Sequence, residues 1–185
     1  MVLEYMNAGT LQDLVSAGIN VTEKMLASVA SSVLRGLVDV HKSKQIHRDI
    51  KPSNILLDRD GHIKISDFGI ARKLEHSISM ASTFTGTLTY MSPERISGQE
   101  YSYPSDIWSL GLCLATLALG RYPFPTDSGY WGVVQAIQDD DPPKVAPGRF
   151  GPYLQDFLNC CLEKDPCRRL SAEGLLKHDF LQRYR

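Results

Sequence analysis

Two short polar segments with a hairpin pattern between them constrain this chain more than any other feature. The first is His47-Arg48-Asp49-Ile50-Lys51-Pro52-Ser53-Asn54, and the second is Asp67-Phe68-Gly69. An apolar run at 55–57, turn-forming residues at 58–61 and an alternating stretch at 63–65 separate them, which predicts two short antiparallel strands. The hairpin would carry Asn54 at its entry and Asp67 at its exit, so that both side chains can face one point.

The residue types in these segments suit the transfer of a phosphoryl group. That reaction uses a carboxylate to orient and deprotonate the attacking hydroxyl, a cation beside the phosphate, and oxygen ligands for Mg²⁺. A carboxamide together with a carboxylate is a suitable Mg²⁺ ligand set. Each short motif alone occurs by chance. Asn54 five positions after Asp49 and Asp67 eighteen positions after it make chance a poor explanation.

From end to end the chain resembles the protein kinases. Residues 47–54 resemble the catalytic loop, 67–69 the start of the activation segment and Ser92-Pro93-Glu94 its end, while 106–111 and 164–169 match two further landmarks. The resemblance implies a mainly α fold, the C-terminal (large) lobe of a kinase with short β-hairpins. Within a partial catalytic domain over 1–185, it implies a hinge at 1–9, the lobe at 10–185 and the activation segment at 67–94.

The same resemblance implies roles for individual residues. Asp49 would be the catalytic base, Lys51 would contact the transferred phosphate, and Asn54 and Asp67 would hold Mg²⁺. The expected ATP-binding residues are Glu4 and Met6 through their backbones, together with Ser53, Asn54, Leu56 and Asp67.

Further residues have expected structural roles. His47 would pack on Phe68 and hold the catalytic loop, and the buried Asp106 would accept hydrogen bonds from that loop's backbone. Glu94 and Arg169 would form a buried ion pair between the activation segment and the lobe.

The activation segment is similar to that of the mitogen-activated protein kinase kinases, most clearly at 83–87, 90–96 and 105–112. Members are activated by phosphorylation of two hydroxyl residues in this segment. Thr83 fits both known spacings, whereas its partner is Ser77 in the plant-like spacing and Ser79 in the animal-like one. A phosphate on Thr83 adds a charge of about −1.5 to −2 and could order the loop against an arginine such as Arg48. The alternative is an unmodified, flexible Ser/Thr-rich loop. Thr87 is expected in the substrate-facing loop.

A Gly-rich phosphate loop and a strand lysine are absent from the 185 residues, so the small β-rich lobe is expected to be missing. Either the sequence is a fragment, which we favour, or it is a short product with a non-catalytic role. The parent enzyme would use ATP and Mg²⁺, act on a downstream MAP kinase and be activated by an upstream kinase. The chain alone is expected to be inactive. As a non-enzyme it would be a decoy or scaffold that binds kinase partners.

Composition indicates one soluble domain and excludes some partners. A net charge of −1 gives no attraction to nucleic acid or to an acidic membrane, and the longest apolar stretch, 107–120, is too short to span a bilayer. Four cysteines without CxxC spacing indicate reduced, packed thiols in a cytoplasmic or nuclear protein.

Apolar spacing predicts helices at 10–16, from 21–23 onward, and at 106–119, 129–138, 151–162 and 171–182. The apolar face of the second comprises Met25, Leu26, Val29, Val33, Leu34, Leu37 and Val40.

Overall fold

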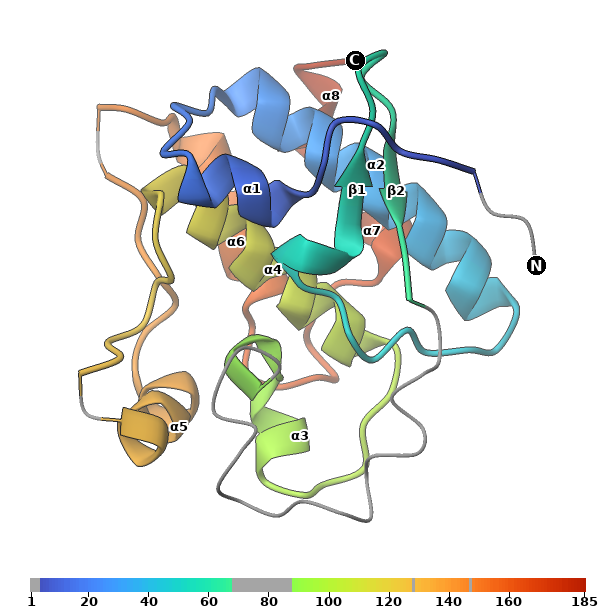
Figure 1. The fold of residues 1–185 in the computed structure, drawn as a ribbon. Coiled ribbons are helices and arrows are strands. Elements are labelled where there is room, and N and C mark those ends of the chain that lie inside the picture. The colour runs from blue at the N-terminus through green and yellow to red at the C-terminus, as the bar shows by residue number, and fades with distance from the viewer. Residues whose placement is uncertain (1–3, 68–87, 128, 147) are drawn as a thin grey trace.

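The computed structural model of the chain describes residues 4–67, 88–127, 129–146 and 148–185 (Figure 1). This part is mainly helical, as expected, and its elements follow in this order: α1 (Leu11–Ser16), α2 (Glu23–Lys42), the 3₁₀ turn η1 (Pro52–Asn54), β1 (Ile55–Leu57), β2 (Ile63–Ile65), the 3₁₀ turn η3 (Leu88–Tyr90), α3 (Pro93–Ile96), α4 (Pro104–Leu119), α5 (Gly129–Asp139), α6 (Pro152–Cys161), α7 (Ala172–Leu175) and α8 (Asp179–Gln182).

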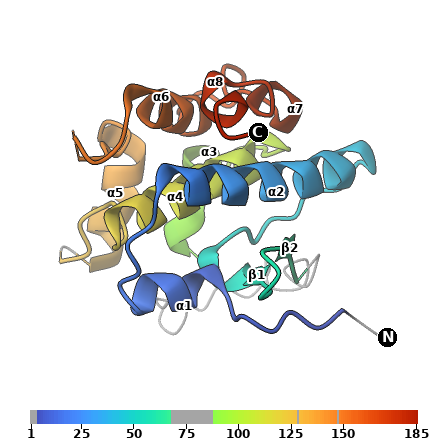
Figure 2. The ribbon, with the colours of Figure 1, turned by 90° about the horizontal axis from the view of Figure 1, so that it is seen from above.

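The helices are arranged in layers. In Figure 2, α2 and α4 lie in the middle, with α6, α7 and α8 on one side and α1 with the β-hairpin on the other. Within the described ranges the hairpin is the sole sheet. It is antiparallel, and Ile55 pairs with Ile65 and Leu57 with Ile63. The predicted hairpin is therefore confirmed.

Side-chain caps start the first two helices where the sequence predicted. Thr10 Oγ1 accepts the backbone N–H of Asp13 at 3.3 Å, and Asp13 accepts the N–H of Thr10 at 2.8 Å. Thr22 Oγ1 accepts from Met25 N at 3.3 Å and caps α2. The predicted apolar face of α2 is buried from Leu26 onward, but Met25 is 38% exposed. One residue step turns a helix by about 100°, so Met25 lies beside the apolar stripe and not on it.

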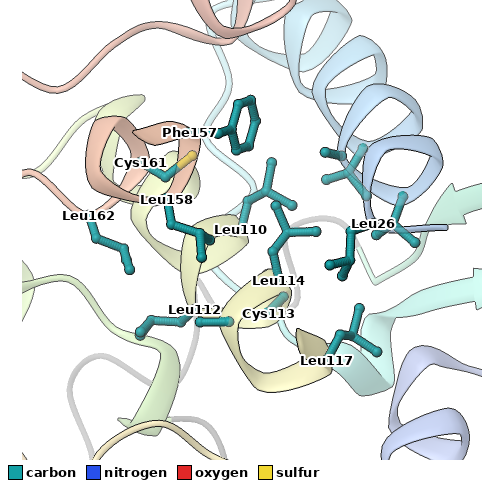
Figure 3. Close-up of a cluster of buried hydrophobic side chains, with 14 of the residues drawn as sticks. Leu26, Leu110, Leu112, Cys113, Leu114, Leu117, Phe157, Leu158, Cys161 and Leu162 are labelled. Carbon is teal, nitrogen blue, oxygen red and sulfur yellow. The ribbon is translucent and has the colours of Figure 1, made fainter. Parts of the chain in front are cut away.

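Helix α4 is buried along nearly its whole length and forms the centre of the core (Figure 3). It begins at Pro104, two residues earlier than predicted, with proline in the first turn. Gly120, with φ of +68°, ends it in a left-handed conformation. Gly111 allows α6 to approach closely, because a Cβ there would lie 2.7 Å from Cys161 Cβ.

The prediction of one closing helix over 171–182 is wrong. The chain forms α7 and α8 instead, because His178 adopts an extended backbone between them. Its Nδ1 accepts the N–H of Phe180 at 3.2 Å and so caps α8. The turn brings the Phe180 ring to 5.3 Å from that of Phe157. A favourable aromatic contact and a cap thus outweigh continuation of the helix.

None of the helices in the described ranges has both the length and the apolar character that crossing a membrane requires.

Candidate active site

The β-hairpin brings Asn54 and Asp67 to the same end, as the sequence predicted. Asn54 directly precedes β1, and Ser66 follows β2. Ser66 donates its backbone N–H to the Asn54 carbonyl oxygen at 2.9 Å, and its hydroxyl lies 3.3 Å from Asp67 Oδ2. Backbone pairing therefore fixes the separation of the two residues.

Asp49 is the centre of the polar cluster. Asn54 Nδ2 donates to the carbonyl oxygen of Asp49 at 2.9 Å and to its Oδ2 at 2.8 Å. Lys51 Nζ lies 2.8 Å from the same Oδ2. No described residue donates to Asp49 Oδ1. One carboxylate oxygen is therefore held in place, while the other can accept a proton from a ligand.

Two non-glycine residues of the cluster have a left-handed backbone. Arg48 has φ of +73° and Asp67 has φ of +63°. Conformations of this kind cost roughly 1–3 kcal/mol each and persist where the surroundings impose them. Both flank the cluster directly, whereas the third such residue in the described ranges, Lys44, lies just after α2.

The buried Asp106 helps to hold the backbone of Arg48 in its left-handed conformation. Its Oδ2 accepts the backbone N–H of His47 at 2.9 Å, and its Oδ1 accepts that of Arg48 at 2.9 Å. A carboxylate can only accept, so the third bond, 2.9 Å from His41 Nε2, is donated by the imidazole. The predicted bonds from the catalytic-loop backbone to Asp106 are therefore present.

His47 links the loop to the hairpin. Its Nε2 donates to the Ser66 carbonyl oxygen at 2.9 Å, and its Nδ1 lies 3.3 Å from Asp49 N. Burial lowers the pKa of His47, against the opposing charge of Asp106. The ring is therefore neutral near pH 7, with its proton on Nε2. The expected packing on Phe68 lies outside the described residues.

The predicted ion pair between Glu94 and Arg169 is present and buried. Arg169 Nη1 lies 2.9 Å from Glu94 Oε1, and Nη2 lies 3.0 Å from Oε2. Burial opposes ionisation of Glu94, but the hydrogen bonds and charge of Arg169 outweigh it, so the pKa of Glu94 is lowered. The pair joins α3 to the loop that follows α6.

Residues 1–181 match the family model of the protein kinase domain. The chain belongs to the protein kinase family. Mitogen-activated protein kinase kinases are among the curated relatives that it matches along its whole length. Mitogen-activated protein kinase kinase 1c of Physcomitrium patens and mitogen-activated protein kinase kinase 1 of Arabidopsis thaliana are each 44% identical to this chain over 191 residues. The MAP kinase kinase skh1/pek1 of Schizosaccharomyces pombe is 42% identical over 195 residues. These alignments cover 55%, 54% and 53% of the relatives, so the chain spans about half their length.

Residues 4–9 of this kinase chain lie along the hairpin. Ala8 N donates to the Leu57 carbonyl oxygen at 3.0 Å, and Leu57 N donates to that of Gly9 at 2.9 Å. The exposed Glu4 carboxylate pairs with Lys64 of β2, and Met6 is half-buried. The expected hinge is thus attached to the same hairpin that positions Asn54 and Asp67.

The remaining predicted residues fall into two groups. Ser53 is exposed in η1, and Leu56 is half-buried in β1, where it bridges Thr10. The expected regulatory and substrate-loop residues Ser77, Ser79, Thr83 and Thr87 lie outside the described residues.

Sequence reasoning missed three polar residues that support this kinase site. His41 holds Asp106, Ser105 donates from Oγ to Glu94 Oε1 at 2.9 Å, and Arg95 donates to the Arg48 carbonyl oxygen at 2.7 Å. Ser105 beside Asp106 at the start of an apolar helix was a usable signal, because buried polar groups need partners. His41 and Arg95 carried no comparable pattern.

A second cluster of potential ligands, Asp156, Cys160 and His178, is poorly suited to a metal. His178 Nδ1 accepts the N–H of Phe180, so the neutral ring carries its proton on Nε2, the atom 3.2 Å from Asp156 Oδ2. A metal at Nε2 would displace that proton and disturb the cap of α8. Cys113 and Cys161 are buried, and burial raises the pKa of both thiols, consistent with the predicted packing role. Cys167 is exposed, so the prediction that all four cysteines are packed is wrong for this residue.

Proposed function

We propose that the protein carrying this chain transfers the γ-phosphate of ATP to hydroxyl groups of a protein substrate, and that this substrate is the activation loop of a downstream MAP kinase. The observation that carries the proposal is the Asp49 carboxylate, which Lys51 and Asn54 hold by one oxygen. The names of the relatives support the substrate class. An upstream kinase is the expected activator.

Asp49 is the proposed base. Its Oδ1, which receives no hydrogen bond from the described residues, accepts the proton of the attacking hydroxyl and so orients it toward the phosphate. Lys51 has its cationic group 2.8 Å from Asp49 Oδ2, close enough to contact the transferred phosphate as well. The lysine thereby places positive charge beside the reacting groups, where charge stabilisation is most effective.

Asn54 and Asp67 fit a magnesium site. Asn54 uses its side-chain nitrogen for both bonds to Asp49, so its oxygen remains as a ligand, and the exposed Asp67 adds a carboxylate. Oxygen ligands of these two kinds suit Mg²⁺. When bound, Mg²⁺ would neutralise charge on the ATP phosphates.

The adenine side of the site is assigned to the segment along the hairpin. The backbones of Glu4 and Met6 would hydrogen-bond the base, Leu56 would pack beneath it, and Ser53 would contribute near Asn54. Support comes from the attachment of residues 8–9 to Leu57 of β1, which holds this segment along the hairpin whose other end carries Asn54.

Two substitutions in the full-length protein test the separate roles proposed for Asp49 and Asp67. Asp49→Asn keeps the shape of the side chain but removes the base, and should lower kcat by roughly 10²–10⁴-fold without unfolding the protein. Asp67→Asn should act through Mg²⁺, so high Mg²⁺ should partly restore its activity but not that of Asp49→Asn. Asp60→Asn, in the exposed hairpin turn, is the matched control and should retain activity. Equal rescue of both variants by Mg²⁺ would contradict the separate roles.

We further propose that residues 1–185 alone have no useful kinase activity. They contain no Gly-rich loop and no strand lysine of the kinase type. In kinases these two elements cover and hold the ATP phosphates and so supply part of the electrostatic stabilisation of the transferred group. The check is an assay of the purified 185-residue chain with a MAP kinase as substrate. Robust ATP-dependent phosphorylation would refute this part of the proposal.

A further inference from the structure

An apolar pocket lies between helices α3 and α5, which pack against each other at one end of the molecule (Figure 1). It holds about 190 Å³ and is more enclosed than open. Its apolar lining comes from Ile96 of α3 and from Val133, Val134 and Ile137 of α5, and hydroxyl-bearing side chains, Thr126 among them, complete it. A small, enclosed hollow of this kind suits a compact molecule better than an extended chain.

The size and the lining of the pocket select a single apolar ring. A water molecule takes about 30 Å³ in the liquid and needs two to four polar partners, which aliphatic side chains do not offer. Water therefore fills such a pocket poorly, and a ligand that displaces it gains affinity. Apolar cavities of about 150 Å³ bind benzene. The pocket of about 190 Å³ has room for one ring with a short substituent.

The charges around the pocket favour a positive group on that substituent. Residues 122–143 contain four aspartates and no lysine or arginine. Asp127 directly follows Thr126 of the pocket lining, is exposed, and takes part in no ion pair within the described ranges. Lys164 reaches the other end of α5, where its Nζ donates to the Gln138 carbonyl oxygen at 2.7 Å. A cation beside Asp127 would therefore be attracted and an anion repelled.

We propose that this pocket binds a small aralkylamine, a molecule with one aromatic ring and an ammonium group on a short aliphatic stem. The ring lies between α3 and α5 among Ile96, Val134 and Ile137. The ammonium group stays at the mouth of the pocket, in water and beside Asp127.

The elements around the ring also support the catalytic loop. Arg95, next to Ile96, donates to the Arg48 carbonyl oxygen at 2.7 Å. Thr89, a further lining residue, accepts the Tyr122 hydroxyl on its carbonyl oxygen at 2.5 Å. A ligand that fills the space between α3 and α5 would restrain α3 and, through it, the loop. This consequence rests on the proposed phosphotransfer, whereas the binding itself does not.

The experiment compares three probes on the full-length protein by ligand-observed NMR: phenethylamine, the neutral 2-phenylethanol and the anion phenylacetate. For a ligand of this size, the Kd of phenethylamine should be roughly 0.1–1 mM. Exposed carboxylates attract weakly, so 2-phenylethanol should bind up to about fivefold more weakly, and phenylacetate more weakly still. Equal binding of the three probes, or no binding of phenethylamine, overturns the proposal.

Two pairs of variants test the pocket and the charge separately. Val134→Phe fills the pocket with its own ring and should weaken phenethylamine binding at least about tenfold, whereas Val38→Phe, at a half-buried position of α2, should not. Asp127→Asn should remove the preference for phenethylamine over 2-phenylethanol. Asp139→Asn should keep it, because Asp139 lies about 200° around α5 from Ile137. Thermal melts check folding, and if Val134→Phe does not fold, Val134→Thr keeps the shape and should weaken binding of both ring probes.

Further arms separate the source of the ring from the function. A capped tripeptide with phenylalanine between two lysines should bind no more tightly than phenethylamine; tighter binding would assign the pocket to a protein segment and overturn the proposal. Saturating phenethylamine should raise the phosphorylation rate of wild type but not of Val134→Phe, and an unchanged rate with intact binding overturns the coupling to the loop. Asp49→Asn should bind phenethylamine normally, which distinguishes failure of the pocket from failure of the proposed catalysis.

Discussion

Replacing Glu94 with Gln should be among the most destabilising single substitutions in this chain. Arg169 is almost fully buried, and its guanidinium charge is matched only by Glu94 among the described residues. Glutamine keeps an oxygen that can accept from Arg169 and Ser105 but removes the negative charge. Leaving a buried cation unpaired costs roughly 3–5 kcal/mol, which is a large part of a typical domain stability of about 5–15 kcal/mol.

The structure also predicts that removing both charges will not restore stability. Replacing a buried ion pair with apolar groups is often neutral. Here Arg169 additionally donates to three carbonyl oxygens, those of Glu163 at 2.7 Å, Pro104 at 2.9 Å and Lys164 at 3.2 Å. The double variant Glu94→Gln/Arg169→Met would leave these acceptors without donors, at about 1–3 kcal/mol for each buried group. It should therefore be at least as unstable as the single variant.

Urea unfolding followed by the fluorescence of Trp108, whose ring lies 5.2 Å from the Arg169 guanidinium carbon, measures both effects. The pH dependence is a further check. The pKa of Glu94 is lowered from 4.5, so its stabilising contribution is present above pH 4.5 and is lost as the pH falls below that value. Glu94→Gln should remove this part of the acid sensitivity. A loss below about 1 kcal/mol in Glu94→Gln at pH 7 would refute the reasoning, because it would mean that the Arg169 charge is not effectively buried.

Two further predictions concern activation and packing. In the full-length protein, Thr83→Ala should prevent activation by the upstream kinase, and mass spectrometry should find the second phosphate on Ser77; phosphate on Ser79 and none on Ser77 would show the animal-like spacing. Gly111→Ala should lower the unfolding free energy by about 1–3 kcal/mol, because the added methyl meets the buried face of α6. Gly36→Ala is the comparison, since its methyl meets only the Ile65 side chain, at Cδ1 and Cγ1, and an equal loss in thermal melts would contradict the packing argument.

Much of the fold could be predicted because local signals were strong. The apolar stripe of α2 and the turn residues of the hairpin each act over a few positions, and the structure follows them. The closing helices show where such signals stop being sufficient. Residues 171–182 have helical spacing, but a tertiary contact between Phe180 and Phe157 and the cap from His178 divide the helix.

The candidate site also combines residues that the sequence could predict with supporting contacts that it could not. Motif spacing placed Asp49, Asn54 and Asp67 in one cluster, because they lie on two segments joined by a short hairpin. Supporting contacts such as that of Arg95 with Arg48 join residues 47 positions apart and depend on the packing of α3. Spacing along the sequence contains no information on such contacts.

The bonds from Asp106 to the catalytic loop have a consequence for the order in which the site forms. The backbone donors of His47 and Arg48 find their acceptor 59 and 58 residues later in the chain. At a synthesis rate of about 5–20 residues per second, the loop would wait roughly 3–12 s for this anchor to be made. The hairpin, whose partners are local, can close within microseconds. In a nascent chain, pairing of the hairpin can therefore begin long before His47 and Arg48 find their acceptor, and the proposed catalytic loop would become ordered only after α4 has docked.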